Sequence, residues 1–520
     1  MNTRMVQLWG RPILALLAGV VGVGGFAPVS EPVWLILAMA VLIRLLAGLS
    51  WRRGAVVGFC FGLGHFTLGF SWLLTSLHDN GGISWILSYL ILVLLAAVMG
   101  MYPALFGGLL AVSVRRPLPT LFAAPALWTL TEWLRTWLFT GFPWNLAGYA
   151  WSPRETILQI ADLGGVFLLT WLTVFVGAAL AVPWRRPVPW LESFLALVLA
   201  VTLLTGAHGY GVWRLDHLHQ LMAAPGTTPL RVALVQGNIP QITKWVPENQ
   251  DQTMKIYLDL TRTLVPPLDL VIWPETAVPF FLQLNTSYQE RIGRISAKIG
   301  APILTGVPTA NPEQHNGQRT WRFFNSVVLM NETGTMDRRY DKHHLVPFGE
   351  FIPARWMVPR SIEKLTGGGD DFIPGPGPFP LPWEKGDLGI LICYETIFPE
   401  EVRQLAEAGA RWLINVTNDG WFGESAKPQH LAMARMRAVE NRLPMLRVAN
   451  TGISAAFDAM GREVVRIAPN QRDHIQATIL PGPTGSTLYR RTGSAWILAF
   501  AFMVLLARLS DRPPPVTDPV

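Results

Sequence analysis

Long apolar runs dominate the first 210 residues of the chain, and they set the strongest limit on its fold. They lie near 12–27, 31–50, 54–76, 84–113, 118–139, 157–183 and 188–208, and a further run lies near 492–508. We therefore predict a polytopic α-helical membrane domain over residues 1–212, with about seven transmembrane helices of roughly 20 residues each. A final transmembrane helix and a cytoplasmic tail are predicted over residues 488–520.

The composition agrees with a membrane protein. Only 15% of the 520 residues are charged and the mean hydropathy is +0.31, so the chain is too apolar for an ordinary soluble enzyme. The formal charge is +7, but the arginines form small clusters between apolar runs, which argues against nucleic acid as a partner. The run 12–27 could be a cleaved signal peptide, but no convincing cleavage site follows it, and we interpret it as a retained helix.

Arginine pairs indicate which side of the membrane each loop faces, because arginine concentrates on the cytoplasmic side. These residues fall near both chain ends and in alternate loops, at Arg52 and Arg53, Arg115 and Arg116, and Arg185 and Arg186. The intervening loops have few arginines, with Arg135 and Arg154 as exceptions. After seven crossings, the interval 213–487 would emerge on the far side of the membrane, which in a bacterium would be the periplasmic side of the inner membrane.

The interval 213–487 has a different pattern, in which short β-like runs alternate with amphipathic helical runs. The helical runs are 247–265, 284–299, 400–409 and 428–442. The β-like runs are 230–239, 268–277, 301–309, 323–331, 388–395, 411–419 and 446–458. This alternation predicts a layered α/β domain with a largely buried sheet. The Gly/Pro-rich tract 366–383 predicts a long, functional loop.

Cys393 ends the apolar run in DLGILICYETIF, where a side chain can project from a sheet edge toward a ligand. The other cysteine, Cys60, lies in an apolar run, so the two predict no disulfide framework. A free cysteine at such a position is often only a small core residue. Glu275 in LVIWPETA and Lys342 in RRYDKHHLVPFGEF lie in similar contexts, although each could equally be a solvated surface charge.

These three residue types together could form a nucleophilic site. A thiol attacks as the thiolate, so it needs a base or a nearby cation. Glu275 could accept the proton of Cys393, and the ammonium group of Lys342 could stabilise a tetrahedral oxyanion. His343 and His344 follow the lysine, but adjacent strand residues point to opposite faces and no third ligand has suitable spacing. We therefore expect no metal site.

The segments WPETAVP, YDKHHLVPFGEF and ICYE, in this order, resemble the Glu–Lys–Cys triad of the carbon–nitrogen hydrolase (nitrilase) superfamily. Within it, the chain most closely resembles the bacterial apolipoprotein N-acyltransferase family. The segments LVQGNIPQITKW, TNDGWFG and TGFPWNLAGY extend this resemblance over nearly the whole chain. It departs mildly at Gly420, where alanine is expected to be common. The resemblance implies an α/β, nitrilase-like αββα sandwich as the extramembrane catalytic domain over 213–487.

The resemblance also implies roles for individual residues. Glu275 would be the general base, Lys342 the oxyanion stabiliser and Cys393 the nucleophile. Further implied site residues are the supporting residues Glu350, Tyr394 and Glu395 and the substrate-binding residue Trp245.

The implied reaction is an acyl transfer at the membrane surface. An acyl chain would pass from a phospholipid, phosphatidylethanolamine, through a thioester on Cys393 to the α-amino group of the N-terminal diacylglyceryl-cysteine of a lipoprotein. This ping-pong reaction is the last step of lipoprotein maturation, and it needs no cofactor. Both substrates are anchored in the bilayer, which accounts for the apolar runs. We expect a monomer, since one chain can handle both substrates.

Two other functions stay open from the residues themselves. A membrane-tethered amidase or nitrilase would pass its acyl group to water and need no second lipidated substrate. A transporter or scaffold would have lost catalysis, although the intact Glu, Lys and Cys argue against it. Glu132 and Arg135, three residues apart on one predicted helix, could pair with each other or contact a lipid headgroup.

Overall fold

The computed structural model describes residues 3–113, 117–184, 189–222, 228–315, 318–357, 364 and 370–510. The chain divides into two compact units. The helical unit contains Met1–Ser71, Tyr89–Val212 and Thr492–Val520, and the α/β unit contains Trp72–Ser88 and Trp213–Arg491. The short segment Trp72–Ser88 includes the end of the apolar run 54–76 and the start of the run 84–113, and it belongs to the α/β unit. Arg115, Arg116, Arg185, Arg186 and residues 366–369 of the Gly/Pro-rich tract lie outside the described residues.

Each apolar run predicted from the sequence contains a helix. The helices are α1 (Thr3–Gly22), α2 (Pro32–Leu46), α3 (Trp51–Gly69), α4 (Trp85–Ser113), α5 (Pro117–Arg135), α7 (Ala161–Ala181), α8 (Trp190–Met222) and α15 (Ala495–Ser510). Among the described residues, three apolar helical segments are long enough to cross a membrane, namely Trp85–Val112, Ala161–Trp184 and Trp190–Met222. Shorter apolar helices cover Gly10–Gly25, Pro32–Leu46 and Ala495–Ala507. The helical region is confirmed, and its polytopic arrangement stays a prediction.

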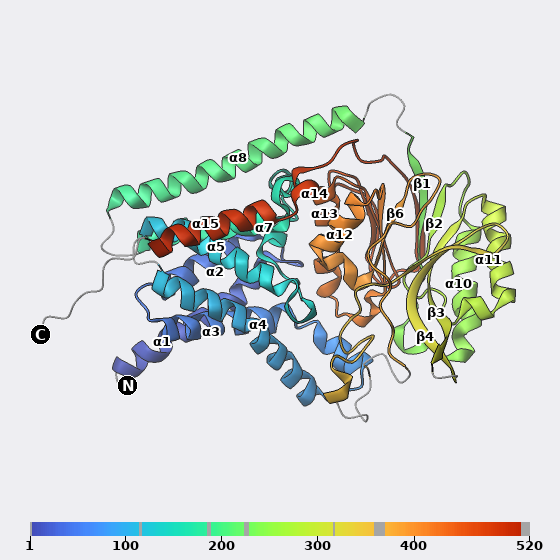
Figure 1. The fold of residues 1–520 in the computed structure, drawn as a ribbon, viewed down its shortest axis with the longest axis horizontal. Helices are drawn as coiled ribbons and strands as arrows, with labels where there is room; N and C mark the ends of the chain where they lie inside the picture. The colour runs from blue at the N-terminus through green and yellow to red at the C-terminus, as the bar shows by residue number, and fades with distance from the viewer. Residues whose placement is uncertain are drawn as a thin grey trace, which may run out of the picture. The chain divides into compact units, whose positions relative to one another are not determined.

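Two mixed sheets form the centre of the α/β unit (Figure 1). The first sheet has the order β11 (Asp473–Ile479), β1 (Leu230–Gln236), β2 (Leu270–Ile272), β3 (Ile303–His315), β4 (Gln318–Met330) and β5 (Met336–Asp341). The second has the order β10 (Glu463–Ile467), β9 (Ser454–Phe457), β8 (Met445–Ala449), β7 (Trp412–Thr417) and β6 (Leu388–Ile392). The β1–β2–β3 and β6–β7–β8 neighbours are parallel, and the outer pairs are antiparallel.

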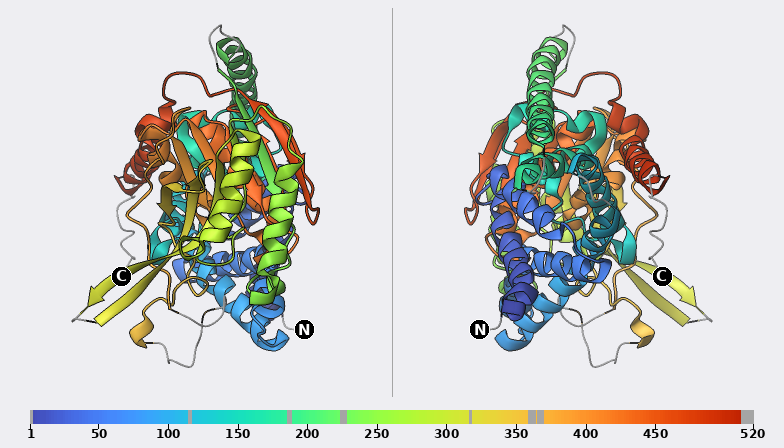
Figure 2. Two further views of the ribbon diagram at one scale, coloured as in Figure 1. Left: turned by 90° about the vertical axis from the view of Figure 1, so that its right-hand side faces the viewer. Right: turned by 90° about the vertical axis from the view of Figure 1, so that its left-hand side faces the viewer.

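The side chains of β1 show why the sheets are buried on both faces. Successive strand residues point to opposite faces, so Val232 and Leu234 pack between the two sheets while Ala233 and Val235 face the outer helices. The outer helices on this side are α10 (Gln250–Arg262) and α11 (Thr286–Ile299), shown in front of the sheet in the left view of Figure 2.

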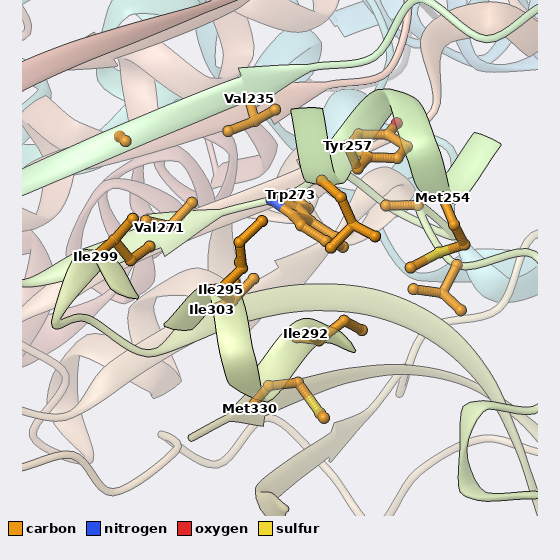
Figure 3. Packing of buried hydrophobic residues seen from close by; sticks show 14 of the residues in the cluster. Val235, Met254, Tyr257, Val271, Trp273, Ile292, Ile295, Ile299, Ile303 and Met330 are labelled. Carbon is orange, nitrogen blue, oxygen red and sulfur yellow. The ribbon is translucent and has the colours of Figure 1, made fainter. Parts of the chain in front are cut away.

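The core beneath these helices follows from their helical spacing. Met254, Tyr257 and Leu258 of α10 pack over Trp273 (Figure 3). Residues three and four apart share one face of a helix. On the other sheet, α12 (Pro399–Glu407) and α13 (Ala426–Asn441) bury a separate apolar cluster. The unit is therefore a four-layer αββα sandwich.

Three strands were not predicted, and one predicted strand was wrong. The run 446–458 forms two antiparallel strands, β8 and β9. The missed strands β5, β10 and β11 are all edge strands, and most of their residues are exposed or half-buried. Edge strands need no continuous apolar run, because one side of the strand faces no neighbour.

The close approach of β3 to residues 274–276 positions the candidate Glu275. The nitrogen of Gly306 donates to the Pro274 carbonyl at 3.2 Å. A Cβ atom added at Gly306 would lie 2.5 Å from the Thr276 nitrogen and 2.6 Å from Glu275 Cα. Only a glycine allows this contact without a shift of the main chain.

We expect Gly306→Ala to lower the free energy of unfolding by about 1–3 kcal/mol, because residues 274–276 must move to admit the methyl group. Thermal unfolding of the detergent-purified protein measures this change. Gly206→Ala in α8 is the matched control, because a Cβ there meets no atom within 4 Å and alanine favours a helix. Equal losses in the two variants would contradict the prediction.

Candidate active site

A buried ammonium group joins two of the predicted residues. Lys342 directly follows β5, and its side chain is 1% exposed. Its Nζ lies 3.0 Å from Oε1 and 2.9 Å from Oε2 of Glu350, and 3.9 Å from Oε1 of Glu275. The structure therefore brings Glu275 together with Lys342 and Glu350, although Glu275 lies on a separate segment of the chain.

Asn325 on β4 fixes the two carboxylates in place. Its Nδ2 donates to Oε1 of Glu275 and to Oε1 of Glu350, each at 2.8 Å. The main-chain carbonyl of Asn325 also accepts a hydrogen bond from the main-chain nitrogen of Lys342 at 2.8 Å. The sequence analysis missed Asn325. The signal was one amide residue at a buried position of a mostly apolar strand segment, FFNSVVLM, because buried amides are usually hydrogen-bonded.

The carboxylates keep the Lys342 ammonium charged. Burial alone would lower the pKa of Lys342, but Glu350, Glu275 and Cys393 outweigh it, and the pKa rises above its usual value. A buried cation is tolerated only when it is paired and hydrogen-bonded. Lys342 is therefore a fixed positive charge at neutral pH.

Cys393 follows β6 directly, at the start of the short helix η9 (Cys393–Ile397). Cys393 is 5% exposed and packs at the end of the core between the two sheets. Burial raises the pKa of the thiol, Glu275 raises it further, and Lys342 opposes both effects. The thiol is therefore protonated at rest, and its proton has to pass to a base as it attacks. The mutual electrostatic effects indicate that the three predicted groups are close together.

Strained residues accompany these side chains. Thr276, next to Glu275, has φ +45°, and Cys393 has φ +52°. Non-glycine residues rarely adopt this conformation, and such strain concentrates at functional sites. Phe348, between Lys342 and Glu350, has φ +61°, so such strain occurs in all three segments that the sequence selected.

Glu395 holds the main chain on both sides of the site. Its Oε1 accepts from the Tyr340 hydroxyl at 3.0 Å and from the nitrogens of His343 at 2.6 Å and His344 at 3.2 Å. Its Oε2 accepts from the nitrogen of Ile392, before the nucleophile, at 2.6 Å. Burial raises the pKa of Glu395 to about 8, while the Ile392 hydrogen bond acts to lower it. Glu395 thus ties the segment after Lys342 to the segment that carries Cys393.

Tyr394 is buried beside the ring of Phe398, at 5.0 Å between centroids, and near His344, at 5.6 Å. Nδ1 of His344 lies 2.6 Å from the Glu401 carboxylate. The part of the chain that the structure describes contains no cluster of three or more His, Cys, Asp or Glu residues that could hold a metal ion.

Lys244 is a second buried lysine that the sequence analysis did not select. It ends the short helix α9 (Gln241–Lys244), directly before Trp245, which is 42% exposed. Its Nζ donates to the Glu275 carbonyl at 3.1 Å, and it forms no ion pair with any described residue. Burial lowers the pKa of Lys244 to about 7, although Glu275 and Cys393 act to raise it. No spacing rule distinguishes this lysine from a surface one.

A buried ion network lies behind the nucleophile. Asp419, just after β7, accepts from the Thr417 hydroxyl at 2.8 Å, pairs with Arg447, and lies 3.3 Å from Nδ1 of His430. Burial acts against its ionised form, but Arg447 and His430 lower the pKa of Asp419 to about 2. The sequence analysis quoted this segment, TNDGWFG, without assigning a role to Asp419.

Glu132 and Arg135 lie in the helical unit, away from these residues in the chain, and both are buried. Oε1 of Glu132 lies 3.7 Å from Nη2 of Arg135. The Arg135 side chain also donates to the carbonyls of Phe142 and Trp144, at 3.0 and 2.6 Å. This geometry favours the interpretation as a structural pair.

Comparison with known proteins agrees with the fold. Residues 231–488 match the carbon–nitrogen hydrolase family, and residues 18–179 match the apolipoprotein N-acyltransferase N-terminal domain. The apolipoprotein N-acyltransferase of Geobacter metallireducens is 34% identical over 95% of this chain and 94% of its own length. That of Methylococcus capsulatus is 36% identical over 92% of each chain. The chain belongs to the apolipoprotein N-acyltransferase family. The resemblance predicted from the sequence is confirmed, as are a nitrilase-like α/β fold and an acyltransferase activity.

We expect Lys244→Met to slow the alkylation of Cys393 by iodoacetamide about three- to tenfold at pH 6, because a nearby cation favours the thiolate. The pKa of Lys244 is about 7, so its charge is present below pH 7 and lost above it. The ratio of wild-type to variant rates should therefore fall toward one above pH 8. Rates followed by intact mass across this range measure the effect.

Lys427→Met is the matched control, because Lys427 is also buried but is paired with Glu424 at 2.7 Å. If the ratio of wild-type to Lys244→Met alkylation rates does not change with pH, Lys244 acts only through its hydrogen bond to Glu275.

Proposed function

We propose that this acyltransferase moves an acyl chain from phosphatidylethanolamine to the α-amino group of the N-terminal diacylglyceryl-cysteine of a lipoprotein, through a thioester on Cys393. The observation that carries the proposal is the grouping of a buried thiol with a buried ammonium group and a nearby carboxylate. This grouping supports Cys393 as the nucleophile, Lys342 as the oxyanion stabiliser and Glu275 as the general base.

The first half-reaction forms the thioester. Glu275 takes the thiol proton as the sulfur attacks the ester carbonyl carbon. Oε1 of Glu275 accepts from Asn325, whereas Oε2 accepts no hydrogen bond from any described residue, so it can receive the proton. The Lys342 ammonium stabilises the oxyanion. The intermediate then collapses, and Glu275 returns the proton to the departing lysophospholipid oxygen.

The second half-reaction releases the product. The neutral amine attacks the thioester carbonyl, Glu275 accepts the amine proton, and Lys342 again stabilises the oxyanion. The C–S bond breaks, the amide remains on the lipoprotein, and Cys393 regains its proton from Glu275. Glu350, Tyr394 and Glu395 support this geometry, while Trp245 is exposed enough to contact a substrate.

Both proposed substrates carry acyl chains, so we place the apolar helices of residues 1–212 and 488–520 in the bilayer, with multiple crossings of the bacterial inner membrane. The segment Trp72–Ser88 stays with the α/β unit. The catalytic domain, 213–487, then lies on the periplasmic side, as the arginine pairs indicate. One chain would bind both substrates in turn as a monomer.

We expect the detergent-purified protein to gain the mass of one acyl chain when incubated with phosphatidylethanolamine, because the thioester persists without an amine acceptor. Neutral hydroxylamine should remove it. Intact mass spectrometry measures both steps. Cys393→Ala should gain no mass, and Cys60→Ala, the matched control at the other free cysteine, should behave as wild type.

Acylation of Cys393→Ala would contradict the assignment of the nucleophile. The release of lysophospholipid and free fatty acid without any gain of mass would favour a hydrolase. If neither mass gain nor released product is seen, the proposed donor is wrong.

A further inference from the structure

The segment Trp72–Ser88 belongs to the α/β unit, although its two ends lie within the apolar runs 54–76 and 84–113. It contains the short helix η2 (Thr75–Asn80). The Ser76 hydroxyl donates to the Trp421 carbonyl at 2.7 Å. Nδ2 of Asn80 donates to the carbonyls of Gly420 at 3.1 Å and Trp421 at 3.2 Å. Two side chains of η2 thus provide three hydrogen bonds to one turn.

The turn that receives these bonds, residues 418–423, directly follows β7. The turn also donates one hydrogen bond to the segment Trp72–Ser88, from the Gly423 nitrogen to the Trp72 carbonyl at 3.3 Å. The rings of Trp72 and Phe422 also pack edge to face, with centroids 5.0 Å apart. A Cβ added at Gly423 would lie 3.1 Å from Trp72 Cα, so the two main chains are in close contact. The contact therefore combines hydrogen bonds with packing.

One end of this turn reaches the nucleophile. Asp419 accepts from the Thr417 hydroxyl at 2.8 Å, and both residues lie close enough to Cys393 to shift the pKa of its thiol. Phe422 of the same turn packs against the apolar core cluster that contains Cys393. Asp419 is further held by Arg447. A shift of the turn would therefore move the groups that contact the thiol.

The same turn also reaches the main chain of Glu275. Nδ2 of Asn418 donates to Oε1 of Gln241 at 2.6 Å. Gln241 begins the one-turn helix α9, and Lys244 at its end donates to the Glu275 carbonyl at 3.1 Å. The turn 418–423 is thus linked to Glu275 by hydrogen bonds and to Cys393 by packing.

We propose that Ser76 and Asn80 are positioning residues for acyl transfer, which hold the turn 418–423 and, through it, Cys393 and Glu275 in the reacting geometry. The inference rests on the proposed function. Neither residue needs to touch a substrate. Misplacement of reacting groups by about 1 Å can cost a hundredfold in rate, so these few hydrogen bonds can control the reaction from outside the site.

The test compares Ser76→Ala, Asn80→Ala and Asn80→Asp with wild type, by the initial rate of acylation with phosphatidylethanolamine. Alanine removes the donors, whereas aspartate keeps the shape of asparagine but brings a carboxylate against two carbonyl oxygens. We expect rates to fall about threefold or more with alanine and about tenfold or more with aspartate. The half-saturating lipid concentration should change less than about twofold.

Asp79→Asn is the matched control, because Asp79 lies in the same helix but is exposed. It should acylate at a rate within about twofold of wild type. A contact that acts only by filling space would give the opposite order, with alanine worse than aspartate. That order, or an Asn80→Asp rate within twofold of wild type, would overturn the inference. If Asn80→Asp does not fold, a Ser76→Ala acylation rate within twofold of wild type would overturn the inference.

Failure of the proposed function has a separate signature. If the wild type forms no acyl-enzyme, the proposed function fails, and the rate of Cys393 alkylation by iodoacetamide in the same variants then tests the positioning role. An unchanged alkylation rate in all three variants would overturn that role, and the expected order of rates would support it.

Discussion

A buried ammonium group must be paired with carboxylates, and the pairing of Lys342 organises the candidate site. Glu350 holds the ammonium from one side and Glu275 approaches it from the other, while Asn325 orients both carboxylates. Removal of any one group would leave a buried charge or amide without its partner. This lowers the free energy of unfolding by more than the intact pair raises it. This mutual requirement fixes the positions of three side chains that come from separate segments of the α/β unit.

The nucleophile is held by different forces. Cys393 lies at the end of an apolar core, where burial keeps its thiol protonated, and its strained main chain is fixed by Glu395 through the Ile392 nitrogen. A resting thiol is less open to alkylation and oxidation than a thiolate. In the proposed reaction, the thiolate forms only when a substrate carbonyl, Glu275 and Lys342 act together. The site thus combines a permanently charged lysine with a cysteine that becomes reactive only during attack.

The sequence predicted the layered fold and the three grouped residues, because both depend on local patterns. Apolar strands and amphipathic helices have clear periods, and Glu275, Lys342 and Cys393 follow or adjoin strands in quoted motifs. The sequence did not predict the edge strands β5, β10 and β11, which have no apolar period. It also missed Asn325 and Lys244, because their roles depend on burial and on partners that are distant in the sequence. No local pattern shows that a lysine beside an exposed tryptophan has a buried ammonium group.

The discontinuity of the α/β unit has a consequence for biogenesis. Ser76 and Trp421, which share a hydrogen bond, are 345 residues apart in the sequence. The segment Trp72–Ser88 leaves the ribosome long before β7 exists, so its partners are absent during most of synthesis. The unit can be completed only if the loop between α3 and α4 and the later domain are delivered to the same compartment. A chain inserted with an inverted loop would lack the donors for the turn 418–423, so correct topology becomes a condition for a complete catalytic domain.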